Sequence, residues 1–386
     1  MATIIPPKPA APAKNLQSVA EALQKAADKG NAKAQYGLGL LFASGQGVKQ
    51  SSRMAMVWYR KAADQGHAAA QCVLGTKYAT GQGVAQDSRK AIGWYLKAAN
   101  QGDVRAQCHL GEIYSAGTLV PRDSMQAEHW YQRAAETGDA EAQLQLAKLY
   151  DVTQRFMAVT WFRRAAEQGI GEAQAMMGNR YATGDGVEQD WQEAFEWFLK
   201  AAEQGNLNAQ WNLGLIYAEG RGGEVDADEA MYWLSRASKH GFVPAQAALA
   251  LLYANGEIVP QDYKKAAFLW KKAAEKGDGE AQHNLGYLYA SGFGVEPDPA
   301  QARHWYQQAA ETGIAEAQVK AGLSYVLEDS LSYDLVEAYK WFSIAAEAGN
   351  EAGRANAAHA EGLMTPEQLE DGRRRVSEWL EAFRAK

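Results

Sequence analysis

Apolar residues along the chain fall at helical spacing, in pairs of short runs separated by glycine. Residues 67–102 illustrate the pattern. Their first apolar run has i, i+4, i+8 spacing, which places one face toward a core: Ala70, Leu74 and Tyr78. Gly81 and Gly83 end this helix and permit a tight turn. The second run keeps helical periodicity and is closed by Gly102: Ala91, Trp94, Tyr95, Ala98 and Ala99. The pattern predicts a helix–turn–helix unit.

The same unit recurs along almost the whole chain, each time marked by an Ala-Gln pair. Successive glutamines are 36 residues apart, except for one step of 31 residues between Gln143 and Gln174. The glutamines of the repeats are Gln35, Gln71, Gln107, Gln143, Gln174, Gln210, Gln246, Gln282 and Gln318. A unit of this length is too small to bury its own apolar face and must stack on copies of itself. The sequence therefore predicts an all-α solenoid of helix–turn–helix repeats.

Capping residues recur in the same register as the glutamines. Side chains that accept hydrogen bonds from orphan N–H groups stand where each second helix should begin: Ser51, Asp87, Asp123, Asp190, Asp226, Asp262, Asp298 and Asp334. A glycine able to adopt the left-handed conformation closes each second helix: Gly30, Gly66, Gly102, Gly138, Gly169, Gly205, Gly241, Gly277, Gly313 and Gly349. These positions are explained by helix termination and are poor candidates for function.

Small residues recur four and eight positions after the glutamine of each first helix. The pairs are Gly39/Ala43, Gly75/Ala79, Gly111/Ser115, Gly178/Ala182, Gly214/Ala218, Ala250/Ala254 and Gly286/Ala290. Glycine inside a helix costs about 1 kcal/mol relative to alanine, so its recurrence predicts close approach of neighbouring helices. The second helices instead carry large residues, which hold their neighbours further apart: Trp58, Trp94, Trp130, Trp161, Trp197, Trp233, Trp305 and Trp341. A stack with one tight and one wide layer curves, so we expect the first helices to line its concave face.

The repeat motif resembles a known family. The string A-x-x-x-L-G-x-x-Y-x-x-G-x-G-V-x-x-D-x-x-x-A-x-x-W-Y-x-x-A-A-x-x-G is similar to the Sel-one-like repeat (SLR), an α-solenoid relative of the tetratricopeptide repeats, and residues 67–102 and 170–205 fit it nearly position by position. The resemblance implies a right-handed α-α superhelical solenoid with nine repeats over residues 31–349. It also implies a non-catalytic protein–protein interaction scaffold or adaptor, in signalling or in the assembly of protein complexes.

Three segments lie outside these repeats. Residues 1–15 are rich in proline and are expected to form a disordered tail, and residues 16–30 resemble a second helix without its partner. Residues 350–386 are expected to form polar capping helices, which a solenoid needs for solubility. Within the array, the fourth repeat lacks the G-x-G-V loop and the ninth has VLEDSLSYD in its place. We expect both departures to disturb the superhelix locally.

Charge and cysteine content narrow the class of protein. A net charge of -7 argues against a nucleic-acid binder, which needs a basic stripe to neutralise phosphates. The N-terminal residues lack the apolar segment of a signal peptide, and no later stretch could insert in a membrane. Cys72 and Cys108 occupy equivalent places in neighbouring repeats, about 9–10 Å apart, whereas a disulfide needs Cα atoms within about 7 Å. We therefore expect free thiols and a cytoplasmic, bacterial protein.

No local motif carries catalysis. The seven histidines show no H-x-x-x-H spacing, and C-x-x-C does not occur. The loops that begin at Gly81 and Gly184 follow helices and lack the lysine of a phosphate loop. We therefore predict no catalytic residue, no metal ligand and no cofactor. Cysteine-rich relatives carry a disulfide in each repeat, and their attributed β-lactamase-like activity is not implied for a chain without those pairs.

Candidate binding residues are the variable positions on the first helices. Positions two, five and nine after each glutamine share the face assigned to the groove. They include Ala248 and Leu251, and Trp211 is added as an aromatic residue outside the Trp register. The predicted protein-binding residues are His109, Glu112, Gln145, Lys148, Asn179, Trp211, Asn212, Leu215, Asn284 and Tyr287. Their mixed polar and apolar character suits a partner peptide, helix or domain laid along the groove.

Two other functions fit the same sequence. One is a cytoplasmic immunity protein that inhibits a single toxin, which would also bind protein. The other belongs to a different class, a hydrolase whose ionisable groups converge from distant repeats. The first predicts rescue of growth on co-expression with a toxin, and the second predicts substrate turnover by the purified protein.

Overall fold

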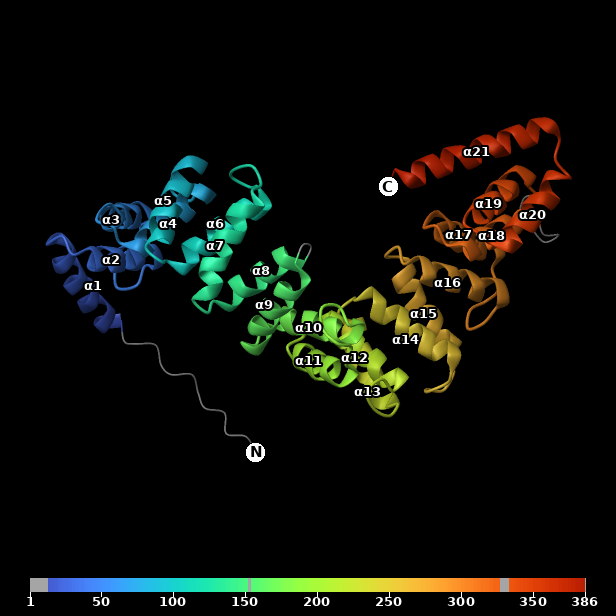
Figure 1. Cartoon of the computed structure of the whole chain (residues 1–386), viewed down its shortest axis with the longest axis horizontal. Coiled ribbons are helices and arrows are strands. Elements are labelled where there is room, and N and C mark those ends of the chain that lie inside the picture. The colour runs from blue at the N-terminus through green and yellow to red at the C-terminus, as the bar shows by residue number, and fades with distance from the viewer. Residues whose placement is uncertain (1–12, 152–153, 327–332, 386) are drawn as a thin grey trace. The chain divides into compact units, whose positions relative to one another are not determined.

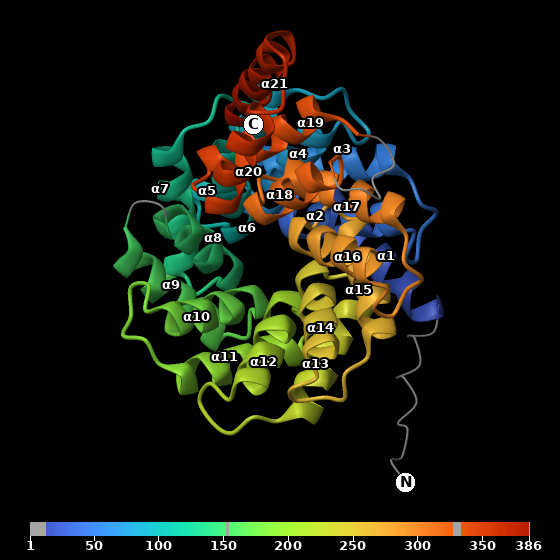
Figure 2. The same cartoon turned by 90° about the vertical axis from the view of Figure 1, so that its right-hand side faces the viewer.

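The described part of the chain is helical throughout. The computed structural model describes residues 13–151, 154–326 and 333–385, and within them it contains helices and turns but no strand. The predicted disordered tail lies mostly outside these residues. The chain divides into two compact units, Met1–Gln189 (unit 1) and Asp190–Lys386 (unit 2). Within each unit the helices follow one another in chain order as antiparallel pairs (Figure 1, Figure 2).

Nearly every helix is about thirteen residues long, as expected from the repeat. Unit 1 contains α1 (Ala13–Asp28), α2 (Ala32–Ser44), α3 (Ser52–Asp64), α4 (Ala68–Thr80), α5 (Ser88–Asn100), α6 (Val104–Ala116), α7 (Ser124–Glu136), α8 (Ala140–Asp151), α9 (Arg155–Glu167) and α10 (Gly171–Thr183). Unit 2 contains α11 (Trp191–Glu203), α12 (Leu207–Glu219), α13 (Ala227–Lys239), α14 (Val243–Asn255), α15 (Tyr263–Ala274), α16 (Gly279–Ser291), α17 (Pro299–Glu311), α18 (Ala315–Leu323), α19 (Leu335–Glu347), α20 (Glu351–Glu361) and α21 (Pro366–Arg384). Even-numbered helices from α2 to α18 are the first helices of their repeats.

The predicted helix ends are confirmed. All eight predicted caps accept a hydrogen bond from a backbone N–H in the first turn of their second helix. The ten closing glycines all have positive φ, which only glycine adopts without steric cost. The predicted all-α fold of helix–turn–helix repeats is therefore confirmed.

The recurring glycines make room for the second helix of the same repeat. A Cβ added at Gly39, Gly75 or Gly111 would lie 2.6 Å from the tyrosine ring that packs against it. The predicted close approach is confirmed, but it joins the two helices of one repeat rather than the first helices of neighbouring repeats. Thus these glycines do not by themselves imply a tight first-helix layer, and the assignment of the concave face stays a prediction.

The tryptophans of the second helices pack onto the preceding repeat. Trp130 on α7 lies in one buried cluster with Tyr95 and Ala99 of α5 and Leu110 of α6. Trp58 likewise packs on residues of α1 and α2. In these repeats the indole therefore fills a slot between its own helix and the helix pair before it, which joins consecutive repeats within the unit.

Each repeat glutamine bonds to the preceding helix. Its side-chain Nε2 donates to the backbone carbonyl eight residues earlier, in the last turn of that helix, at 3.0–3.3 Å in every repeat. All nine glutamines are at least nine-tenths buried. The same carbonyl also accepts from the N–H of the closing glycine, as Ala63 does from Gly66 at 2.9 Å, so the amide is a second donor at the helix end.

The side-chain oxygen of the repeat glutamine accepts a hydrogen bond where a second glutamine is the C-cap of the second helix of that repeat. Gln65, Gln101 and Gln168 donate to it at 2.7, 2.7 and 2.8 Å. In five other repeats the capping position holds Thr, His, Lys or Ala, and the buried oxygen has no partner among the described residues: Gln107, Gln210, Gln246, Gln282 and Gln318.

A buried arginine occupies the region of the shortened fourth repeat. Arg180 of α10, whose side chain is 5% exposed, forms ion pairs with Asp151 at the end of α8 and with Asp185. Arg155, the first residue of α9, also pairs with Asp185 at 3.0 Å. This network links the short α8–α9 connection to the loop after α10. The equivalent segment of the ninth repeat includes residues outside the described part.

The C-terminal helices cover the last repeat. Helix α21 packs on α19, where Trp379 stacks on Phe383 at 4.6 Å and contacts Trp341 at 6.1 Å between ring centroids. The three consecutive arginines of α21 are each ion-paired within the chain, with Glu361, Glu378 and Glu337 among their partners. An acidic partner is not needed to explain them.

Two glycine substitutions should have opposite effects on stability. Gly75→Ala places a methyl group against the Tyr95 ring and should destabilise the protein, because overpacking costs about 1–3 kcal/mol and outweighs the helix-propensity gain of about 1 kcal/mol. Gly93→Ala, inside α5 with nothing within 4 Å of the added methyl, should stabilise it by about 0.5–1 kcal/mol. Urea unfolding followed by circular dichroism measures both. A higher midpoint for Gly75→Ala would contradict the close contact.

Removing one repeat glutamine should destabilise the stack. Gln71→Leu removes two hydrogen bonds, the one from Gln71 Nε2 to the Ala63 carbonyl and the one that Gln71 Oε1 accepts from Gln101, while the Ala63 carbonyl keeps the Gly66 N–H as a donor. At about 0.5–1.5 kcal/mol for each bond, the free energy of unfolding should fall by about 1–3 kcal/mol. The control is Gln86→Leu, which removes an exposed side-chain bond to the Ala79 carbonyl and should change stability by no more than about 0.5 kcal/mol. Equal unfolding midpoints for the two variants would show that burial does not matter to this bond.

Candidate functional site

The predicted binding residues all lie on first helices, where they are half-buried or exposed. In unit 1 they are His109 and Glu112 on α6, Gln145 and Lys148 on α8, and Asn179 on α10. In unit 2 they are Trp211, Asn212 and Leu215 on α12, with Asn284 and Tyr287 on α16. The Ala-Gln pairs and the recurring Leu residues on the same helices are buried in the stack. The predicted binding residues therefore belong to the part of the first-helix surface that varies from repeat to repeat.

The unit 1 candidates are largely engaged with one another or with neighbours. His109 Nδ1 lies 3.8 Å from Glu112, and the His109 ring tilts against Tyr95 at 5.1 Å between centroids. Lys148 pairs with Glu172 at 2.8 Å, which links α8 to α10. Gln145 donates to Glu141 within its own helix at 2.7 Å. This surface is polar and internally paired, and a ligand would have to replace those contacts.

Trp211 contributes to the stack. Its ring packs against the buried cluster that contains Leu234 and Leu249, and it tilts against Phe242 at 6.2 Å between centroids. Its neighbour Asn212 donates to Asn208 on the same helix, at 3.0 Å to the carbonyl and 2.8 Å to the side chain. A truncation of Trp211 would therefore alter packing as well as any binding surface.

Unit 2 carries a row of apolar residues on its first helices, of which three members were named from the sequence although the row was not identified. The fifth position after the glutamine is apolar in four consecutive repeats of this unit: Leu215, Leu251, Tyr287 and Leu323. Leu251 is 49% exposed and Tyr287 is 45% exposed, although both are large and apolar. Comparison of the fifth position across repeats would have revealed the row, because in unit 1 it holds Thr76, Glu112, Lys148 and Asn179 after Leu40.

Phe293 extends this row into the following loop. The residue between the two loop glycines is polar in the other such loops, for example Gln82 and Asp185, but here it is a phenylalanine that is 41% exposed. Its ring stacks on Tyr263 at 5.0 Å and tilts against Tyr287 at 6.0 Å between centroids. The break in polarity was visible in the sequence. The contact between the three rings required the structure.

Reactive groups do not converge in the described residues. No group of three or more His, Cys, Asp or Glu side chains able to hold a metal occurs among them. Cys72 and Cys108 are free, and burial raises the pKa of both thiols to about 12, which leaves them protonated at neutral pH. Burial also lowers the pKa of His67, whose Nδ1 accepts from the Ala70 N–H as the cap of α4. None of the helices described is long and apolar enough to cross a membrane.

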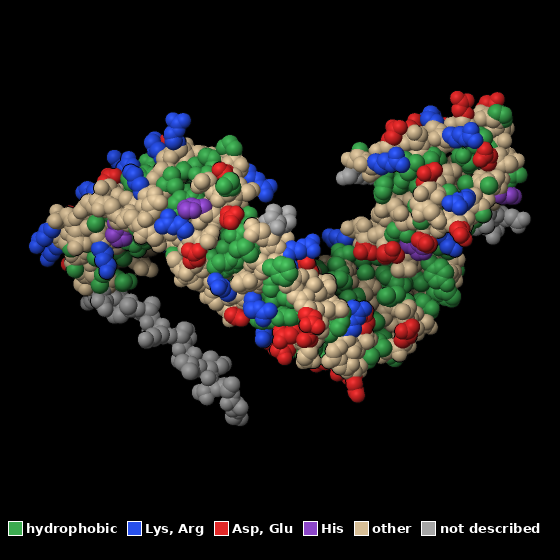
Figure 3. Space-filling view, in the orientation of Figure 1, with side chains coloured by type: hydrophobic (Ala, Val, Ile, Leu, Met, Phe, Trp, Pro, Cys, Tyr) green, Lys and Arg blue, Asp and Glu red, His purple; other side chains and the backbone are tan. Residues whose placement is uncertain are grey.

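Charged and apolar side chains are interspersed on the face of each unit that Figure 3 shows. No extended single-sign face dominates the view. In unit 2 the row that begins at Leu215 adds exposed apolar side chains to this mixed surface, at Leu251 and Tyr287.

The chain is similar to repeat proteins of known structure. The Sel1 repeat model matches nine segments: residues 32–67, 68–103, 104–139, 140–170, 171–206, 207–242, 243–278, 279–313 and 315–350. A protective antigen with an SLR fold from uropathogenic Escherichia coli is 33% identical, over 95% of this chain and 80% of that one, with a TM-score of 0.88. A Sel1 repeat protein from Oxalobacter formigenes is 33% identical, over 81% of this chain and 96% of that one, with a TM-score of 0.62. None of the curated proteins compared with the chain matches it. The resemblance drawn from the repeat motif is confirmed.

Proposed function

The chain belongs to the Sel1 repeat family, whose members are generally non-catalytic scaffolds, and on that premise we propose that it binds a segment of a partner protein along its first helices. Repeat stacks present long surfaces of this kind, on which many modest contacts add up to useful affinity. The partner would be held by side chains that the stack itself does not need.

The observation that carries the proposal is the apolar row of unit 2. Leu251 and Tyr287 expose nearly half of their side chains at equivalent positions of α14 and α16, and Phe293 continues the line. Helices α12 and α14 contact each other, which places Leu215 and Leu251 on adjacent helices. Regularly spaced apolar residues bounded by polar ones suit an amphipathic helix or an extended segment, which offers apolar anchors at matching intervals.

The polar first helices of unit 1 suggest a supporting role. Their charged candidates already form the pairs His109–Glu112 and Lys148–Glu172, so their exchange for bonds to a partner would add little net affinity. We therefore assign the anchoring contacts to unit 2.

The first experiment tests the apolar row directly. A photo-crosslinking residue at position 251 should capture the partner from native extract, and the double variant Leu251→Ser/Tyr287→Ser should reduce capture at least about tenfold, because exposed apolar anchors dominate such interfaces. The matched control is Tyr232→Ser, which removes an aromatic side chain of α13 that is 54% exposed. Both proteins should unfold at the wild-type urea concentration.

The same experiment distinguishes the alternatives. Capture that is unaffected by the double variant would refute the row as the binding surface. An immunity role would add rescue of growth when the chain is co-expressed with a captured toxin. Substrate turnover by the purified chain, without a partner, would contradict the scaffold function itself.

A further inference from the structure

The register of the second-helix tryptophans breaks once, in the seventh repeat. Thirty-six residues after Trp233 the chain has Leu269, and Trp270 follows it. Trp270 is 5% exposed and takes the buried place that Tyr95 holds in its repeat, whereas Leu269 takes the place of the indole. The repeat therefore keeps its internal packing residue and replaces the group that fills the slot against the preceding repeat with a smaller one.

A cavity lies where the indole is replaced. It has a volume of about 620 Å³ and lies between α13 and α15, over α14. Leu269, Leu249 and Ser238 line it, and their counterparts around Trp130 are the indole itself, Leu110 and Ala99, which form one packed cluster. The cavity thus occupies the place that an aromatic side chain fills in other repeats.

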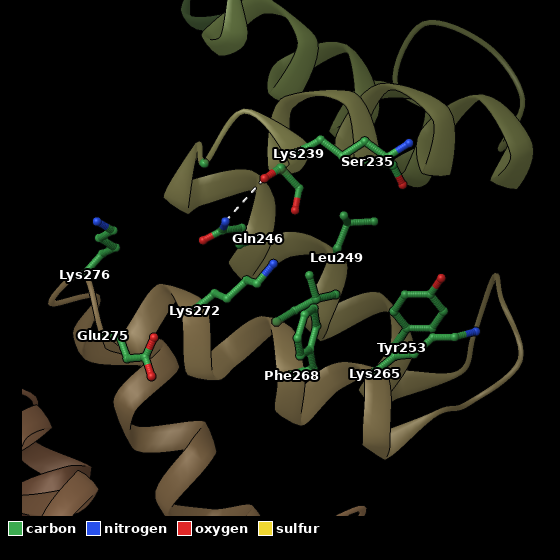
Figure 4. A pocket seen from close by; sticks show the side chains of 13 residues that line it. Ser235, Lys239, Gln246, Leu249, Tyr253, Lys265, Phe268, Lys272, Glu275 and Lys276 are labelled. Atoms are coloured by element: carbon green, nitrogen blue, oxygen red, sulfur yellow. Dashed lines mark hydrogen bonds between the residues drawn. The ribbon is translucent and has the colours of Figure 1, made fainter.

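The basic residues around this cavity have counterparts in the filled slots. Three residues after the tryptophan, six repeats have a cation over its ring: Lys61, Lys97, Arg133, Arg164, Lys200 and Arg236. Lys272 is the equivalent residue, and its amino group instead lies 4.4 Å from the ring centroid of Phe268, which is 60% exposed. Figure 4 shows Lys272 and Phe268 on α15, facing Leu249 and Gln246. An aromatic ring entering the slot would find a cation in place.

The rim of the cavity is positively charged within an acidic chain. Four lysines and one glutamate line it, although the net charge of the protein is -7. Lys265 pairs with Asp262 at 3.4 Å, whereas Lys239, Lys272 and Lys276 have no ion-pair partner among the described residues. This arrangement combines an apolar slot with exposed ammonium groups, and it selects an occupant that is apolar at its centre and anionic at its edges.

We propose that this cavity on the second helices of unit 2 binds an aromatic side chain, a tryptophan by size, carried on an acidic segment of a partner protein. The ring replaces the missing indole between α13 and α15, and flanking carboxylates pair with Lys239, Lys272 and Lys276. The site is separate from the first-helix row and goes beyond the function proposed for it. An open cavity of this size suits a side chain with its neighbours, within the usual range of about 300–1,000 Å³ for ligand sites.

A labelled peptide tests the proposal with the full chain. The probe is a short peptide with one tryptophan between aspartates and glutamates, followed by fluorescence anisotropy. It should bind the wild type, and the matched peptide with alanine for tryptophan should bind at least about tenfold more weakly. Raising the salt concentration should weaken binding, because the lysine contacts are exposed.

The most direct variant places a tryptophan of the chain itself in the slot. Leu269→Trp restores the residue of the other repeats, so it should fold, unfold at no lower urea concentration, and lose at least about tenfold in peptide affinity. Lys276→Glu keeps the slot but reverses one rim charge, and it should also weaken binding. The matched control is Lys97→Glu, whose amino group lies over Trp94, an indole packed on the preceding repeat, and it should bind as the wild type does.

The outcomes separate this site from the first-helix surface. Wild-type affinity in both Leu269→Trp and Lys276→Glu, or equal binding of the tryptophan and alanine peptides, overturns the proposal. The absence of peptide binding to the wild type overturns it as well. Leu251→Ser/Tyr287→Ser should retain binding of the tryptophan peptide. A negative result for the cavity therefore does not refute partner binding by the first-helix row, and a negative result for the row does not refute the cavity.

Discussion

The buried amide of the repeat glutamine is the constraint on which the stack depends. A helix end exposes carbonyl groups that need partners, and a solenoid buries such an end at every junction between repeats. In each repeat the carbonyl eight residues before the glutamine accepts from the closing glycine N–H and also from the glutamine amide, in a place closed to water. The glutamine bond ties the start of one repeat to the end of the helix before it. An apolar side chain of similar size would fill the space but lose this bond and leave the carbonyl with the glycine N–H as its donor.

The other residues that recur in each repeat pack around this junction between repeats. Gly75 admits the Tyr95 ring within a repeat, and Trp130 fills the slot between repeats. The two binding surfaces that we propose use side chains that project from the first helices and places where the register changes, as at Leu269 and Phe293. The two proposed surfaces differ in origin. The first-helix row consists of apolar side chains on the first helices. The cavity arises where one of the recurring packing residues, the tryptophan, is replaced by Leu269.

The helices and their ends were predictable because several local signals agree at each position. Asp87, for example, stands before a periodic apolar run and its side chain accepts from the Lys90 N–H, as the cap position requires. The contact partner of the glycines was not predictable in the same way, since a small residue indicates close approach without naming the approaching group. Trp211 illustrates a similar limit. Its position outside the Trp register indicated an unusual residue, and only the packing against Phe242 placed it in the stack.

The sequence by itself determined the helical repeat, its nine glutamines, its caps and the family to which the chain belongs, because each depends on residues close together in the chain and recurs at a fixed interval. The tertiary structure decided which exposed residues come together. The rings of Tyr263, Tyr287 and Phe293 meet because the loop after α16 returns to the start of α15. The lysines of α13 and α15 share one cavity because those helices flank α14 and no indole separates them. Such groupings depend on three-dimensional packing between helices, which repeat spacing alone does not specify.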